Sequence, residues 1–355
     1  MSRVIRSIEG LGRRLLSVPI RRLSRRRGAC SWPPRRILLL RHDRIGDWVI
    51  TTPLVSELRQ AFPSAEIDVL ASAGNAPLIA ADDRITRVHI LPDRLWDRRA
   101  LVRDCRNRQY DAAFQLVLGA TTTPAILLRR CAPHALLVGN AHSPVRIVFD
   151  RPVNTSGQHF ALRTLSLAAG LLPDWQPVDS THYSLRIPKR VREASLRSIH
   201  EHGLAPDRFI LINLSAGSPD RTLTPGLCLA LIDILRPMGL AIAVTGGPDD
   251  HEAIGLLCAR SGATALVVKG LVESMALYDY PLLVITPDTS IVHVASAASR
   301  PVVALYPRDA DYHGWGPMGT PYRTILSSSR TIAQGIDPEV VAKAVVDLLK
   351  TTRAS

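Results

Sequence analysis

ILLLRHDRIGD, at residues 37–47, is the stretch that decides the fold. The apolar run at 37–40 predicts a strand that is buried on both faces. A polar loop containing Gly46 follows at once, and apolar residues at helical spacing predict a helix over residues 47–61, ending before Pro63. A buried strand, a short loop and a helix in this order indicate the first part of a parallel α/β sheet.

The same alternation of short apolar runs and helical patterns continues along the chain and restarts after Pro206. It predicts two Rossmann-like α/β domains, with residues 146–149 as one of the weaker strands. Because open α/β sheets bind ligands beyond the carboxyl ends of their strands, we expect two parallel sheets facing a central cleft. The predicted parts are a basic extension at 1–34, a first domain at 35–172, a linker at 173–187, a second domain at 188–335 and a C-terminal helix at 336–355.

Most of the net charge of +13 lies at one end of the chain. Residues 1–36 hold eleven arginines and one acid, which leaves +3 for the remainder. Such a segment predicts an anionic partner, and we expect residues 1–27 to contact anionic membrane lipid peripherally; a solvated tail without a partner is the alternative. Nucleic acid is the weaker choice of partner, since it rests on these arginines alone.

The sequence has no apolar run long enough for a membrane span, no apolar core of a secretory signal, and five scattered cysteines. These features predict a cytoplasmic protein, and the basic residues 1–27 would associate it peripherally with the inner face of the inner membrane. No pair of acids stands at a convincing metal-ligand spacing, so we expect neither a metal nor a cofactor.

Asp47 is the first candidate for chemistry, because it follows the first strand at the start of a helix. One interpretation is a charge that favours the helix N-terminus. The other is a general base facing the cleft, supported by the neighbouring charges of Arg41 and Arg44. Thr51 lies in the first turns of the same helix, and these three neighbours are candidates for binding an acceptor or for balancing charge.

Three loops of the second domain are typical of anion-binding turns between a strand and a helix. Residues 215–222 combine small residues with Arg221, which can grip a phosphate, and residues 245–250 contain Gly-Gly-Pro. In the third loop, Asp288 can cap the next helix, and His293 stands about one turn into it. Ordinary turns and a structural histidine are the alternatives. The candidate donor-binding residues are Ser215, Ala216, Gly217, Arg221, Gly247, Asp288, Thr289, Ser290 and His293.

Taken in order, these motifs resemble those of the heptosyltransferase family, glycosyltransferase family 9 of lipopolysaccharide synthesis. The resemblance covers nearly all of residues 36–350 and rests on the segments 37–47, 52–54, 62–63, 213–218, 246–248, 288–297, 301–305 and 316–317. Ser290 and Leu223 depart from the family pattern, which has glycine and tryptophan there.

The resemblance implies a GT-B fold and metal-independent transfer, with inversion, from a nucleotide-diphosphate sugar, typically ADP-heptose, to a lipopolysaccharide-core or similar glycolipid or oligosaccharide acceptor. It implies that Asp47 is the catalytic base and that Arg221 and the loop at Asp288 bind the donor. An epimerase or hydrolase of sugar nucleotides, or a catalytically silent glycan- or nucleotide-binding protein, are the alternatives.

Overall fold

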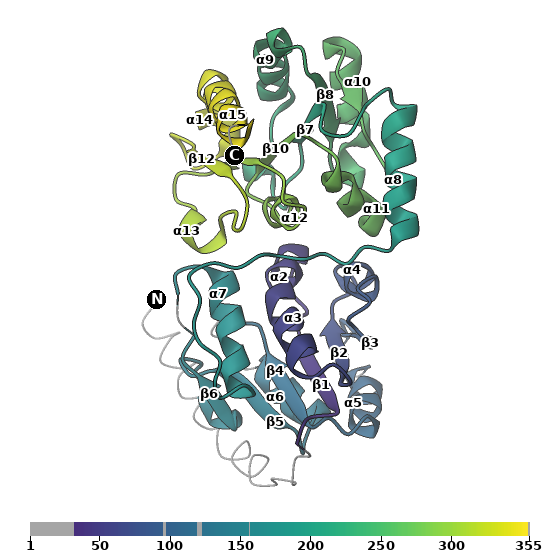
Figure 1. Cartoon of the computed structure of the whole chain (residues 1–355), viewed down its shortest axis with the longest axis vertical. Helices are drawn as coiled ribbons and strands as arrows, with labels where there is room; N and C mark the ends of the chain where they lie inside the picture. The colour runs from purple at the N-terminus through teal and green to yellow at the C-terminus, as the bar shows by residue number, and fades with distance from the viewer. Residues whose placement is uncertain (1–31, 95–96, 119–122, 156, 354–355) are drawn as a thin grey trace. The chain divides into compact units, whose positions relative to one another are not determined.

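A computed structural model describes residues 32–94, 97–118, 123–155 and 157–353. The chain divides into two compact units: unit 1 runs to residue 157 and includes 161–179, and unit 2 contains 158–160 and 180–355 (Figure 1). The predicted linker at 173–187 stays a prediction. The predicted basic extension, residues 1–34, lies almost wholly outside the described residues. Residues 1–27, which are predicted to contact a membrane, lie wholly outside them.

A six-stranded parallel sheet with the order β3-β2-β1-β4-β5-β6 forms the centre of unit 1. Leu39 of β1 lies beside Val69 of β2 and Phe114 of β4. The strands are β1 (Arg36–Leu40), β2 (Glu66–Ala71), β3 (Arg87–Ile90), β4 (Ala112–Gln115), β5 (Leu136–Asn140) and β6 (Arg151–Val153). The helices are α2 (Ile45–Val49), α3 (Thr52–Ala61), α4 (Ala76–Ala80), α5 (Arg98–Asn107), α6 (Thr123–Cys131) and α7 (Phe160–Leu165), with 3-10 turns η1 (Arg146–Val148) and η2 (Ser166–Gly170).

The core of unit 1 forms where helices cover a sheet that is apolar on both faces. Residues 37–40 of β1 are fully buried, as the apolar run predicts. Leu101 of α5 and Leu128 of α6 share one core cluster with Leu38 and Leu40, so these two helices cover the same face of the sheet. Burying such side chains stabilises the sheet by roughly 1.5–3 kcal/mol each.

The predicted helix over residues 47–61 is wrong in its extent, because the structure has two helices, α2 and α3. Proline at position 53 has no N–H to donate to the carbonyl of Val49 four residues earlier. The hydroxyl of Thr52 donates to that carbonyl instead, at 2.7 Å. The break positions α2 as a single short helix directly after β1.

The predicted strand at 146–149 is also wrong. This segment forms the 3-10 turn η1, and the strand β6 begins two residues later. Buried Arg129 explains the turn, since its guanidinium donates to the carbonyl of Val148 at 2.8 Å and to Asp150 at 2.7 Å.

Unit 2 has a second parallel sheet with the order β12-β11-β10-β7-β8-β9. Its strands are β7 (Phe209–Asn213), β8 (Ala241–Thr245), β9 (Thr264–Ala265), β10 (Leu283–Pro287), β11 (Val302–Tyr306) and β12 (Tyr322–Leu326). Its helices are α8 (Lys189–Glu201), α9 (Pro225–Leu235), α10 (His251–Ser261), α11 (Leu271–Ala276), α12 (Ile291–Ala297), α13 (Tyr312–Trp315), α14 (Ile332–Gly335) and α15 (Pro338–Arg353). Short 3-10 turns are η3 (Pro219–Arg221), η4 (Arg236–Met238), η5 (Pro248–Asp250) and η6 (Leu277–Asp279).

The helices α9, α10 and α15 cover one face of this sheet with a continuous apolar core. The edge strand β12 is not among the strands that the apolar runs predict. Its side chains are all partly or fully exposed, with Tyr322 and Leu326 at 46% and 43%, so it lacks the apolar run of a central strand.

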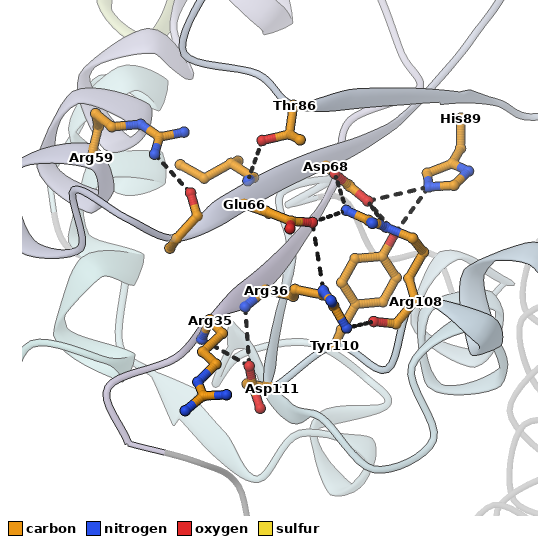
Figure 2. Close-up of polar contacts among 12 residues, drawn as sticks. Arg35, Arg36, Arg59, Glu66, Asp68, Thr86, His89, Arg108, Tyr110 and Asp111 are labelled. Atoms are coloured by element: carbon orange, nitrogen blue, oxygen red, sulfur yellow. Dashed lines mark hydrogen bonds and ion pairs between the residues drawn. The ribbon is translucent and has the colours of Figure 1, made fainter.

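A polar cluster lies at the amino-terminal part of the unit 1 sheet (Figure 2). Fully buried Asp68 of β2 accepts a hydrogen bond from Tyr110 at 2.7 Å and one from Arg108 at 2.8 Å. His89 of β3 lies 2.9 Å from the same tyrosine hydroxyl. These hydrogen bonds connect β2 and β3 to the segment just before β4.

The described helices include none that is both long enough and apolar enough to cross a membrane.

Candidate functional site

Both sheets have the same strand order. Each therefore has one topological switch point, where successive connections leave a strand on opposite sides. In unit 1 the chain leaves β1 towards β2 and later returns to the other side of β1 with β4. In unit 2 it leaves β7 towards β8 and returns with β10. Ligands of doubly wound sheets bind at such points, beyond the carboxyl ends of the strands. The loops after β1, β7, β8 and β10 are therefore the candidate sites.

Arg41 is the centre of the loop after β1. Its side chain is only 3% exposed. Nε donates to the hydroxyl of Thr51 at 2.8 Å, and Nη1 donates to Oδ2 of Asp43 at 2.9 Å. Nη2 lies 3.5 Å from the hydroxyl of Thr164. This buried guanidinium fixes the loop and places a positive charge beside the carboxylates of Asp43 and Asp47.

Asp47 is the second carboxylate of this loop. Its Oδ2 accepts the backbone N–H of Arg44 at 3.1 Å, and its Oδ1 lies 3.7 Å from Nη1 of Arg41. Burial raises the pKa of Asp47 and outweighs the nearby Arg41, while Asp43 raises the pKa further. The hydrogen bond from Arg44 agrees with the interpretation of Asp47 as a charge at the start of α2, and its role as a general base stays a prediction.

The predicted acceptor residues differ in exposure. Arg44 is exposed, whereas Arg41 and Thr51 are buried. The Thr51 hydroxyl accepts from Arg41 and donates to the carbonyl of Asp47 at 2.7 Å. This geometry makes Arg41 and Thr51 supports of the loop and leaves Arg44 as the side chain of the three that solvent reaches freely.

Two buried polar atoms of this loop have no hydrogen-bond partner among the described residues: Nδ1 of His42 and Oδ1 of Asp43. Burial is the main cause that lowers the pKa of His42, so this ring is neutral near pH 7. Buried polar atoms usually have partners, and unpaired ones are typical of sites that bind a ligand or water.

The loops after β7 and β8 meet through one serine. Ser215 accepts a hydrogen bond from the backbone N–H of Gly247 and donates to the carboxylate of Asp250. A Cβ on the neighbouring Gly246 would lie 2.5 Å from the Ser215 hydroxyl oxygen, so only glycine fits there. The predicted residues Ser215 and Gly247 thus lie together, as part of one tight junction.

The loops after β7 and β10 meet through Arg221. Its Nη1 lies 3.2 Å from Oδ2 of Asp288 and 3.4 Å from the carbonyl of the same residue. A Cβ on Gly217 would lie 3.8 Å from the Arg221 guanidinium, which places that glycine beside the cation. Ala216, in the same loop, is half-buried.

Asp288 therefore pairs with a cation, and the prediction that it caps the next helix is wrong. The structure places Ser290 at the N-cap of α12, without a side-chain cap hydrogen bond. Thr289 and Ser290 are half-buried beside Asp288. Because α12 has only seven residues, its dipole is short, and Arg221 supplies the main positive charge of this edge.

His293 is buried away from solvent, with 4% exposure. Its ring lies among aromatic side chains, 5.9 Å from the ring of Tyr183 and 6.1 Å from that of Trp315, measured between centroids. Burial lowers its pKa to about 3, so the ring is neutral at physiological pH. Its Nδ1 has no hydrogen-bond partner among the described residues, and the contact of His293 with a ligand stays a prediction.

The sequence pattern of glycosyltransferase family 9 (heptosyltransferase) matches residues 98–337, which is more than half of the chain. The chain belongs to glycosyltransferase family 9. This confirms the resemblance and makes the protein a glycosyltransferase of the heptosyltransferase family, whose relatives include lipopolysaccharide heptosyltransferases.

Relatives of this family-9 protein are diverged but similar over most of their length. Lipopolysaccharide heptosyltransferase 3 of Escherichia coli K12 is 25% identical over 292 residues, which are 77% of this chain and 82% of that protein. A family 9 glycosyltransferase structure from Veillonella parvula matches with a TM-score of 0.76 at 18% identity, covering 92% of this chain and 99% of that chain. The E. coli heptosyltransferase WaaC with ADP matches at 0.72 and 20% identity, covering 88% and 99%. The predicted GT-B fold class is confirmed.

Two buried asparagines at these loops are not among the residues predicted from the sequence. Asn75, 1% exposed, donates to the carbonyl of Arg41 at 3.1 Å and accepts from the backbone of Ser72 at 2.9 Å. Asn213 donates to the hydroxyl of Thr286 at 3.1 Å. Each stands at or just beyond the carboxyl end of a strand, and that position is the signal that could have pointed to them.

Proposed function

We propose that this glycosyltransferase transfers a heptose from ADP-heptose to a sugar hydroxyl of a lipopolysaccharide-core acceptor, with inversion and without a metal. The proposal rests on the raised pKa of Asp47, which lies in the loop after β1. Burial raises the pKa of this carboxylate, and Arg41 holds the carboxylate in place. A carboxylate with a raised pKa is a stronger base than an ordinary aspartate, which suits the deprotonation of a hydroxyl.

The proposed step is a single displacement. The acceptor hydroxyl oxygen attacks the anomeric carbon as Asp47 takes the hydroxyl proton. The bond between the anomeric carbon and the diphosphate oxygen breaks, and its electron pair leaves on ADP. Attack opposite the leaving group inverts the anomeric configuration. Asp47 ends protonated and returns its proton to solvent.

The donor's diphosphate is assigned to the edge of unit 2 formed by the loops after β7 and β10. Arg221 offers a planar guanidinium that suits phosphate oxygens, and Gly217 beside it lets a ligand approach closely. The backbone N–H groups of Thr289 and Ser290 are further donors for the same group. Positive charge at this edge stabilises the departing diphosphate, which is the part that a metal plays in other glycosyl transfers.

Asp288 is proposed to pair with Arg221 when no donor is bound. In the structure it neutralises Arg221, with 3.2 Å between Nη1 and Oδ2. A bound diphosphate offers the guanidinium more negative charge than one carboxylate does, so it would compete for the same N–H groups. Asp288 then keeps Arg221 in position when no donor is bound.

The acceptor is assigned to the edge of unit 1. Arg44 is the exposed cation there, and Arg41 and Thr51 act through the shape of the loop. The unpaired atoms of His42 and Asp43 are suited to hydroxyl groups of a sugar, since a hydroxyl both donates and accepts.

The experiment is a mass-spectrometric screen of nucleotide sugars against lipopolysaccharide-core acceptors, with chelator present and absent. We expect heptose transfer from ADP-heptose, an inverted linkage by NMR, and unchanged turnover with chelator. Asp47→Asn keeps an oxygen that accepts the Arg44 N–H, so the loop should stay folded while kcat falls about 100-fold or more. Undiminished turnover of a folded Asp47→Asn protein would refute the assignment of the base.

Product analysis also separates the other candidates. An epimerase would return an isomerised sugar nucleotide, and a hydrolase would release free heptose. A catalytically silent homologue would bind the nucleotide without turnover across the acceptor panel. None of these outcomes is compatible with the proposed transfer.

A further inference from the structure

A groove of about 680 Å³ lies along α5 and α6 of unit 1 (both helices are labelled in Figure 1). The apolar faces of these helices, with Leu101 and Leu128, point into the core. The groove is on the remaining faces, and five arginines line it: Arg98, Arg99, Arg103, Arg106 and Arg130. The proposed glycosyl transfer uses none of them.

The charges of α5 are placed unfavourably for the helix itself. It carries four arginines and a single acid, Asp104. Arg103 stands four residues after Arg99 and three before Arg106, and like charges at these spacings repel on a helix surface. Arg98 and Arg99 stand in the first turn, where the helix dipole disfavours cations. An anionic ligand would relieve both effects.

The described residues neutralise little of this charge. Nε of Arg103 lies 4.0 Å from Asp104, and both side chains are mostly exposed, so the pair is weak. Nε of Arg106 donates to the carbonyl of Arg130 at 2.9 Å, and Nε of Arg98 donates to the carbonyl of Pro92 at 3.2 Å. These carbonyls orient two of the guanidinium groups and leave their other N–H groups for a ligand.

Aliphatic side chains form most of the lining between the arginines. They are Val102 of α5 and Ile126 and Leu127 of α6, the apolar floor of the groove, and the other two lining residues, Asn107 and Thr123, are polar. Aliphatic side chains suit an acyl chain, whereas proteins that bind single-stranded nucleic acid offer aromatic rings to the bases, and the described lining of this groove includes no aromatic residue. A free phosphate would leave the apolar floor unused. The combination fits an anionic amphiphile.

We propose that this groove docks the protein on a membrane by binding an anionic glycerophospholipid, with its phosphate among the arginines and the upper part of an acyl chain on the apolar floor. The interaction goes beyond the glycosyl transfer proposed above. Basic residues near an anionic membrane surface each strengthen binding, and an apolar floor adds the hydrophobic part of the attraction.

Hydrogen–deuterium exchange of the full-length protein tests the groove directly. The protein is compared alone, with phosphatidylcholine vesicles, and with vesicles that also contain phosphatidylglycerol. We expect slower exchange over α5 and α6 only with phosphatidylglycerol. Exchange is measured segment by segment, so protection of residues 1–31 is read separately from protection of α5 and α6. Unchanged exchange in both helices would overturn the proposal, and so would equal protection by inorganic phosphate or by the soluble polyanion heparin.

Vesicle co-sedimentation adds a matched pair of variants. The test variant carries Arg103→Gln, Arg106→Gln and Arg130→Gln, and the control carries the same change at three exposed arginines of unit 2, Arg186, Arg190 and Arg197. At about fivefold per cation near the surface, the test variant should bind phosphatidylglycerol vesicles at least about tenfold more weakly than the control. Equal binding by the two variants contradicts the proposal. Both should keep the wild-type melting temperature and the wild-type turnover with a soluble acceptor.

Discussion

Nη1 of Arg41 lies 3.7 Å from Oδ1 of Asp47, yet the pKa of this carboxyl is raised above its ordinary value. Burial is the largest cause, and the cation only partly opposes it because Arg41 shares its charge with Asp43 at 2.9 Å. The charges of these three side chains interact. The pKa of Asp47 therefore depends on how closely the Arg41 guanidinium pairs with Asp47 and how closely it pairs with Asp43.

Replacing Asp43 with asparagine should shift the pH profile of the enzyme. Asp43 raises the pKa of Asp47, and its removal also leaves Arg41 free to pair with Asp47, so both effects lower that pKa. The base is active when deprotonated, so kcat/KM falls as the pH drops through the pKa of Asp47. We expect this acid limb to lie at lower pH in Asp43→Asn than in the wild type. A limb that stays in place, or that moves to higher pH, would argue against Asp47 as the base.

Arg221→Gln should weaken ADP binding by about 10- to 100-fold, the range expected for loss of a charge-assisted hydrogen bond. Isothermal titration calorimetry measures the change directly. Arg208 is an exposed arginine of the same unit, and Arg208→Gln serves as the control that should bind ADP as the wild type does. Equal affinity of Arg221→Gln and the control would exclude Arg221 from the diphosphate site.

Asp288→Asn should act in the opposite direction in the same titration. It removes the carboxylate that lies 3.2 Å from Nη1 of Arg221, so a bound diphosphate no longer has a competitor. We expect ADP to bind at least as tightly as in the wild type, and the effect to vanish when Arg221→Gln is also present. A loss of affinity in the single variant would contradict this competition and show that Asp288 supports nucleotide binding.

His89 should make the stability of unit 1 depend on pH. Burial lowers the pKa of His89, but its interactions with Asp68 and Cys105 outweigh burial and raise this pKa to about 9. The unfolded value is lower, about 6.5, so the stabilisation is complete below about pH 6.5 and is lost as the pH rises through about 9. The loss amounts to roughly 1–3 kcal/mol, a range set by the size of the pKa shift.

Urea unfolding at pH 6 and pH 9 measures this dependence. His89→Gln retains an amide that can donate to Tyr110 but does not titrate, so it should remove most of the difference between the two pH values. The control is His200→Gln, at an exposed histidine of α8. An unchanged difference in His89→Gln would show that another group is responsible.

Short-range patterns were enough to predict much of the fold. The apolar run at 37–40 and the alternation after it predicted the buried strand β1, two α/β units and the loops after β1, β7 and β10. The family followed from the same loops, because their motifs occur in a fixed order. The predictions that failed were also local: the helix over 47–61 continued through a proline, and the strand at 146–149 took no account of buried Arg129, which binds the turn there.

The order of residues along the chain determined which elements form and which loops carry polar groups, because turn residues and apolar spacing act over a few positions. The contacts that give those loops their chemistry depend on the tertiary structure. Arg221 and Asp288 are 67 positions apart, and parallel strands bring them to one edge. The raised pKa of Asp47 and the neutral ring of buried His293 follow from how much water the surrounding side chains exclude, and no local pattern encodes that.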